Sequence, residues 1–167
     1  PRPGVRTEVD SLIESDIRQL GDLLDGFIAE ARAHCAVLVD RSGRLLTQAG
    51  DTGAMDNITF ASLVAGDFAA SDQLARLLGE EEFSSLYHAG EGRSMFLADV
   101  SGWGILAALF DGHTTLGMIR LRSKTLVPKI ATLLHAIATR PRLSEATPGM
   151  DENWVSQAED EIDKLFS

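Results

Sequence analysis

The amino-acid sequence predicts an α+β domain, a five-stranded antiparallel sheet with helices packed on its faces. Two observations lead to this prediction. Apolar residues recur at helical spacing in three long segments, and short apolar runs between them are joined by turns that suit hairpins. The predicted order is α-β-β-α-β-β-β-α, followed by a C-terminal tail. Strands grouped in this way form an antiparallel sheet that helices cover.

The first half of the domain is predicted to hold a helix and a hairpin. A flexible lead at residues 1–8 precedes a helix at residues 9–32, which carries apolar residues at helical spacing. The apolar runs at 35–40 and 44–50 flank the turn sequence RSG, so we expect them to pair as a hairpin.

The second long helix, at residues 58–78, has an unusual distribution of side chains. Asp56 or Asn57 can cap its start, and Gly79 can end it. Its larger apolar residues fall on one broad face, which we expect to be the buried face: Phe60, Leu63, Val64, Phe68, Leu74 and Leu78. Opposite them lies a small-residue strip: Ser62, Ala65, Ala69, Asp72, Gln73 and Arg76. Such a strip would let another backbone or helix approach closely.

The second half is predicted to be a meander and a final helix. Residues 80–93 form a polar connection, and strands follow at 94–100, 104–110 and 116–122. The final helix begins near Thr125, so that Pro128 falls in its first turn, where proline is tolerated.

A predicted basic face lies at the end of the meander. Strand alternation over 116–122 places Arg120 and Arg122 on one side, and Lys124 follows closely. The interval between Asp111 and Glu145 contains six bases and no acid. We expect this face to orient the protein on an acidic partner without a catalytic role, although a solvated edge explains the same pattern.

Residues 141–167 are predicted to be a linker and an acidic tail. Ile162, Leu165 and Phe166 recur at spacings of three and four, which places them on one side of a short amphipathic helix. A helix of this length is marginal alone, so we expect it to form on a partner. The alternatives are that the tail folds back on its own domain or has no role.

Composition limits the classes of function. The chain has 167 residues and a net charge of −10, and so acidic a protein is not expected to bind nucleic acid. We expect neither a signal peptide nor membrane insertion, since no apolar stretch is long enough to span a bilayer. The single cysteine, Cys35, cannot form an internal disulfide, which favours a reducing, cytoplasmic compartment.

The sequence lacks the motifs of a self-contained enzyme. It has no phosphate-binding G-x-x-x-x-G-K-[ST] loop and no G-x-S-x-G nucleophile elbow, and its four histidines lack the spacing of metal ligands. We therefore expect no catalytic residue, no metal and no cofactor.

Three segments resemble the roadblock/dynein light chain family: VLVDRSGRLLTQAG, ASLVAGDFAASDQLARLLGE and FDGHTTLGMIRLR. The resemblance covers roughly residues 12–140 and implies a roadblock domain at 9–140. It also implies a homodimer in which two sheets join and the two central helices lie side by side. Such dimers offer this platform to a small GTPase.

The resemblance implies that the small-residue strip contacts a Ras-like GTPase in its GTP form, or packs on the second subunit. The implied function is a dimeric GTPase-activating regulator in bacterial cell polarity or gliding motility, with a cell pole as its expected place of action. It would hold the GTPase's own catalytic loops in place instead of inserting an arginine. The alternatives are a scaffold that binds a GTPase or another roadblock protein without activation, and a dynein-type adaptor.

Overall fold

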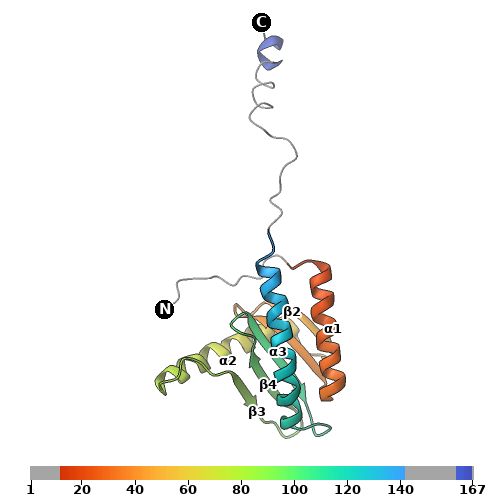
Figure 1. Ribbon diagram of the computed structural model, residues 1–167, viewed down its shortest axis with the longest axis vertical. Helices are drawn as coiled ribbons and strands as arrows, with labels where there is room; N and C mark the ends of the chain where they lie inside the picture. The colour runs from red at the N-terminus through yellow and green to blue at the C-terminus, as the bar shows by residue number, and fades with distance from the viewer. Residues whose placement is uncertain (1–11, 142–160, 167) are drawn as a thin grey trace.

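A computed structural model of the chain describes residues 12–141 and 161–166, which hold eight main helices and strands (Figure 1). Their order is the predicted α-β-β-α-β-β-β-α. The elements are α1 Glu14–Ala31, β1 Cys35–Asp40, β2 Leu45–Gly50, α2 Asn57–Leu77, β3 Ser85–His88, β4 Ser94–Asp99, β5 Gly104–Phe110 and α3 Leu116–Ala138. The predicted lead at 1–8 and most of the predicted linker and tail lie outside the described residues.

The five strands form one antiparallel sheet in the order β2-β1-β5-β4-β3. The predicted hairpin is confirmed as β1 and β2, with an irregularity in register between Leu38 and Val39. Strands β2 and β3 are the two edges of this sheet. An edge strand leaves backbone N–H and C=O groups available for pairing with another chain.

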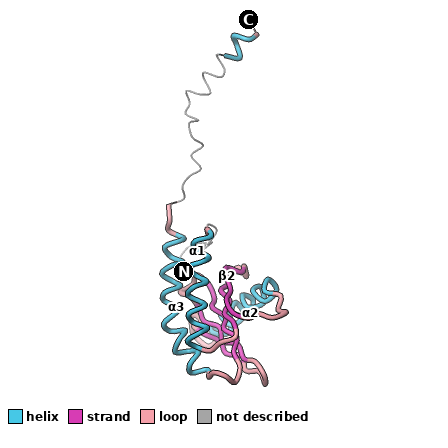
Figure 2. Tube along the Cα trace, turned by 90° about the vertical axis from the view of Figure 1, so that its right-hand side faces the viewer, coloured by secondary structure: helices cyan, strands magenta, loops and turns pink. Residues whose placement is uncertain are grey.

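The molecule has three layers, with α1 and α3 on one face of the sheet and α2 on the other (Figures 1 and 2). Alternation along the strands separates the two cores. In β1, Ala36 and Leu38 pack toward α1 and α3, whereas Val37 and Val39 pack toward α2. The sheet is therefore buried on both faces, which explains why β1 is apolar at successive positions.

The predicted strand at 116–122 is wrong, because these residues form the first two turns of α3. Thr115 caps the helix by accepting a hydrogen bond from the Met118 N–H at 3.2 Å. Ile119 and Ser123 then face the sheet at helical spacing. The missing strand is β3, which lies within the predicted polar connection.

Pro128 consequently lies inside α3 and not in its first turn. Proline has no N–H, so the carbonyl of Lys124, four residues earlier, lacks its usual helical donor.

The first helix differs from prediction as well, since it begins at Glu14. Its start is fixed by Asp16, whose side chain accepts a hydrogen bond from the Ile13 N–H at 3.0 Å.

Asp16 also joins the two helices on this face. Its buried carboxylate accepts two hydrogen bonds from the Arg140 guanidinium, at 2.7 and 3.2 Å. This pairing, together with the bond from Ile13, holds the pKa of Asp16 below its usual range despite burial. The start of α1 is thus tied to the residues just beyond the end of α3.

Candidate partner interface on helix α2

Helix α2 is held at its start by Asp56, whose side chain accepts hydrogen bonds from the N–H groups of Ile58 and Thr59. This confirms the predicted cap. The helix ends at Leu77 and is followed by Gly79, which has a positive φ of 84°. A glycine adopts this left-handed conformation without the steric cost that other residues incur, which is why it ends helices.

The predicted orientation of α2 is partly wrong. The residues that it buries against the sheet are mostly small: Ala61, Val64, Ala65, Phe68, Ser71 and Ala75. Leu63, Leu74 and Leu78, which we expected in the core, are 68%, 56% and 74% exposed. The helix packs closely on the sheet through its alanines, and this contact turns several leucines toward solvent.

Three leucines and two small residues along the exposed side of α2 define a surface that we call the outer α2 face: Leu63, Gly66, Ala70, Leu74 and Leu77. Steps of three and four residues place these positions together along the helix. Leu77 is 82% exposed, and Gly66 and Ala70 leave the surface between the leucines low. Exposed leucines gathered along one side of a helix in this way make it a candidate surface for protein interaction.

The structure divides the predicted small-residue strip. Ser62, Ala69, Gln73 and Arg76 are exposed along one flank of the outer α2 face. Ala65 is instead buried against the sheet at 9% exposure. Asp72 is half-buried and turns inward to Arg41, so neither it nor Ala65 is presented freely to a partner.

Arg41 fixes α2 on the sheet, a role that the sequence did not reveal. It follows β1, and its guanidinium donates to Asp72 at 3.4 Å and also to Asp99 at the end of β4. The guanidinium carbon lies 5.1 Å from the centre of the Phe68 ring, within reach of a cation–π interaction. Three elements thus meet at one arginine, and the outer α2 face is held in a defined place.

Strand β3 lies on the same side of the domain as α2 (Figure 1). His88 in β3 contacts Asp67 in α2, with 2.6 Å between Nε2 and Oδ2. Tyr87 is 42% exposed and stacks on Phe110 at a ring distance of 6.2 Å. The free backbone edge of β3 and the exposed leucines of α2 are therefore neighbouring features.

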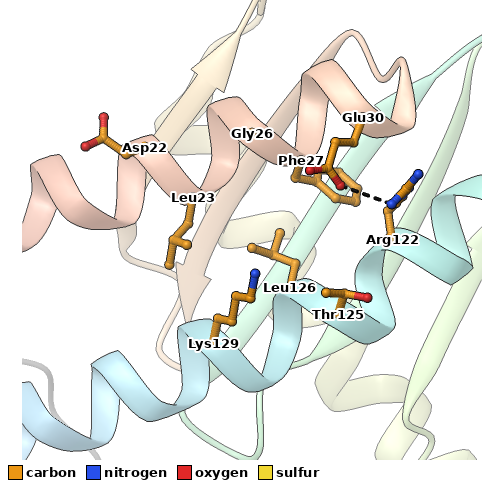
Figure 3. Close-up of a pocket in the computed structure, with 9 residues that line it drawn as sticks. All are labelled: Asp22, Leu23, Gly26, Phe27, Glu30, Arg122, Thr125, Leu126 and Lys129. Carbon is orange, nitrogen blue, oxygen red and sulfur yellow. Dashed lines mark ion pairs between the residues drawn. The ribbon is translucent and has the colours of Figure 1, made fainter.

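The predicted basic face does not exist as one surface, because a helix separates residues that a strand would align. Arg120 and Lys124 lie on one side of α3, and Arg122 lies on the other. Arg122 forms an ion pair with Glu30 of α1, with 3.2 Å between Nη1 and Oε2. The two residues line a groove of about 130 Å³ between α1 and α3 (Figure 3). Since Arg140 also pairs with an acid, two of the five bases that the structure describes in this interval are neutralised.

Of the predicted C-terminal tail helix, the structure describes residues 161–166. Residues 161–165 form a helical turn, and Ile162, Leu165 and Phe166 are 54%, 81% and 88% exposed. Their role in binding a partner stays a prediction.

Within residues 12–141 and 161–166, no cluster of three or more potential metal-ligating side chains occurs. Nor does that part of the chain contain a helix long and apolar enough to cross a membrane.

The fold and its exposed helix define a class of protein. Residues 20–110 match the Roadblock/LC7 domain, and this match covers more than half of the chain. The chain therefore belongs to the Roadblock/LC7 family, as its sequence features indicated. No curated protein sequence matches it.

Within the family, solved structures of MglB are similar to this chain. MglB of Myxococcus xanthus is 32% identical with a TM-score of 0.71, and the match covers 76% of this chain and 96% of that one. The gliding protein MglB of Thermus thermophilus is 28% identical with a TM-score of 0.70, over 74% and 94%. A third MglB, with a tetrameric arrangement, is 27% identical with a TM-score of 0.72, over 75% and 95%.

Proposed function

We propose that this chain is an MglB-like homodimer that binds a Ras-like GTPase of the MglA type in its GTP form and stimulates GTP hydrolysis. The observation that carries the proposal is the outer α2 face, an exposed apolar surface beside the free edge of β3. Similarity to MglB structures over nearly their whole length supports the same function. The cellular role that follows is in bacterial polarity or gliding motility.

The dimer in this proposal forms through β3. Antiparallel pairing of two β3 strands across a two-fold axis would join the sheets and remove one exposed edge from each copy. Because the Asp67–His88 contact links α2 to β3, the same pairing would bring two α2 helices toward each other. Part of the exposed apolar surface would then be covered by the second subunit, and the rest would remain as a platform.

The GTPase in this proposal docks on that platform. Ser62, Ala69, Gln73 and Arg76 flank the leucines and are mostly small or uncharged, which allows a partner's backbone to approach closely. The chain would supply no catalytic group of its own. Holding the partner's loops, water and Mg²⁺ in line with the γ-phosphate can account for acceleration, since phosphoryl transfer depends largely on positioning and electrostatics.

The C-terminal helical turn would add a second contact in this proposal. Ile162, Leu165 and Phe166 are exposed and suited to an apolar groove on the GTPase, away from its nucleotide. Binding there would favour nucleotide exchange. Deletion of residues 150–167 should leave dimerisation and saturated hydrolysis unchanged but weaken GTPase affinity or slow exchange. Unchanged affinity and exchange would contradict this role.

The proposed function is tested by binding. Light scattering should give the mass of a dimer for the chain alone, and calorimetry should show tighter binding to a GTPase loaded with a non-hydrolysable GTP analogue than with GDP. A monomeric mass would contradict the β3 pairing. Equal affinity for both nucleotide states would contradict recognition of the GTP form.

A further inference from the structure

A second cavity lies on the face of the sheet opposite α2, between α3 and the β3–β4 end of the sheet. Its volume is about 500 Å³. The residues that line it include Ser84, Phe96, Arg120, Ser123, Lys124 and Val127. Small-molecule sites in proteins have volumes of about 300–1,000 Å³. The size of this cavity therefore suits a small organic molecule, and an inorganic ion would leave most of it empty.

Positive charge gathers at the α3 wall of this cavity. Arg120 and Lys124 lie one helical turn apart, and both are exposed. No ion pair joins either of them to an acid among residues 12–141 and 161–166. Asp99 also lines the cavity, but its carboxylate already accepts hydrogen bonds from Arg41 and from the Gly102 N–H. The two cations are therefore available to an anionic ligand.

Ser123 provides an independent sign of a ligand. It lies between the two bases in sequence, lines the cavity and is only 3% exposed. Its hydroxyl has no hydrogen-bond partner in the part of the chain that the structure describes. A buried polar group without a partner costs free energy, so such a group needs an explanation. An oxyanion held between the cations would give this hydroxyl an acceptor.

Part of the remaining wall is apolar. Phe96 and Ala98 rise from β4, and Val127 and Pro128 face them from α3. Such a surface contributes binding free energy by removing apolar ligand area from water. An apolar wall beside two cations and a hydroxyl is a typical arrangement for an organic anion.

We propose that this cavity binds a small organic oxyanion of the phosphate monoester type. Its phosphate lies against Arg120, Lys124 and the Ser123 hydroxyl, and its organic part lies against Phe96 and Val127. The site uses neither the outer α2 face nor the pairing edge of the β3 backbone. It therefore goes beyond the proposed function, and the two can fail separately.

The test uses the full chain and phenyl phosphate as the probe, measured by calorimetry and by amide chemical shifts. Phenyl phosphate should bind once per chain, with shifts centred on Ser123 and Ser84. Inorganic phosphate and the neutral benzyl alcohol should each bind at least tenfold more weakly, because each lacks one half of the complementary chemistry. Ser123→Ala should weaken phenyl phosphate binding roughly tenfold, the effect of losing a hydrogen bond to a charged group.

Arg120→Gln combined with Lys124→Gln should abolish detectable binding. Lys129→Gln is the matched control, because Lys129 is also exposed on α3 but lines the groove on the α1 side. It should bind phenyl phosphate like the parent chain. The proposal is overturned if the double variant binds as well as the control, or if benzyl alcohol binds as tightly as phenyl phosphate. It is also overturned if an acidic peptide of residues 156–167 binds this cavity while phenyl phosphate does not.

Discussion

The outer α2 face should lose its partner when Leu74 is replaced by arginine. Complete burial of a leucine side chain contributes roughly 1.5–3 kcal/mol. Leu63, Leu74 and Leu77 are 68%, 56% and 82% exposed, so covering the exposed part of each would contribute roughly 1–2 kcal/mol. Leu74→Arg removes one such contribution and places a charge in an apolar contact, which adds a desolvation cost. A loss of about 3 kcal/mol corresponds to a roughly hundredfold weaker interface.

The assay pairs this variant with a matched control. Leu121 in α3 is 57% exposed, almost the same as Leu74, but lies across the sheet from α2. Both Leu74→Arg and Leu121→Arg should keep the parent Tm within a few degrees, because neither side chain belongs to the core. Sedimentation and GTPase titration should then show a loss of dimer or of GTPase affinity for Leu74→Arg only. If both variants behave like the parent in both assays, the outer α2 face is not the interface.

Four further experiments test separate parts of the structure. Gln73→Arg should leave the dimer intact but prevent stimulation of the GTPase, as measured by hydrolysis at saturating concentration, because a bulky charge blocks close approach. Arg41→Ala should lower the free energy of unfolding by roughly 2 kcal/mol in urea titration, since two aspartates lose a charged partner. Burial raises the pKa of the Cys35 thiol, so it should react slowly with a thiol reagent in the native protein and rapidly in urea; equal rates would contradict its burial. The hydrogen bonds from Arg140 lower the pKa of Asp16 in the folded protein. The pair therefore stabilises the fold fully above the pKa of an unfolded aspartate, about 3.9, and this stabilisation is lost as the pH falls through the lower pKa of the folded state. Arg140→Gln should reduce this acid sensitivity in Tm measurements from pH 2 to 6.

Local signals predicted most of the fold. The hairpin of β1 and β2 follows from two apolar runs around a short turn, and the start of α2 follows from the Asp56 cap. The sequence of segment 116–122, LGMIRLR, predicts a strand wrongly because it alternates like a strand and also repeats like a helix. The cap at Thr115 and the apolar residues beyond Ser123 favour the helix, which continues through Pro128.

Long-range contacts determine what the sequence did not predict. Strand β3 has the sequence SLYH, which is too short and too polar to be recognised before its pairing with β4 is known. Apolar periodicity predicts the orientation of α2 only in part, because it places leucines toward the core, whereas the exposed leucines form the outer α2 face. Helix α2 is apolar on two sides, and periodicity alone cannot say which side the sheet covers.

The most direct measurement of the central claim is single-turnover GTP hydrolysis by a cognate MglA-type GTPase, titrated with this chain. The hydrolysis rate should rise with chain concentration and reach a plateau well above the intrinsic rate. Leu121→Arg should give the same curve, whereas Leu74→Arg should shift it to much higher concentration. A rate that stays at the intrinsic value while the GTPase is fully bound would contradict activation and would leave a scaffold as the function.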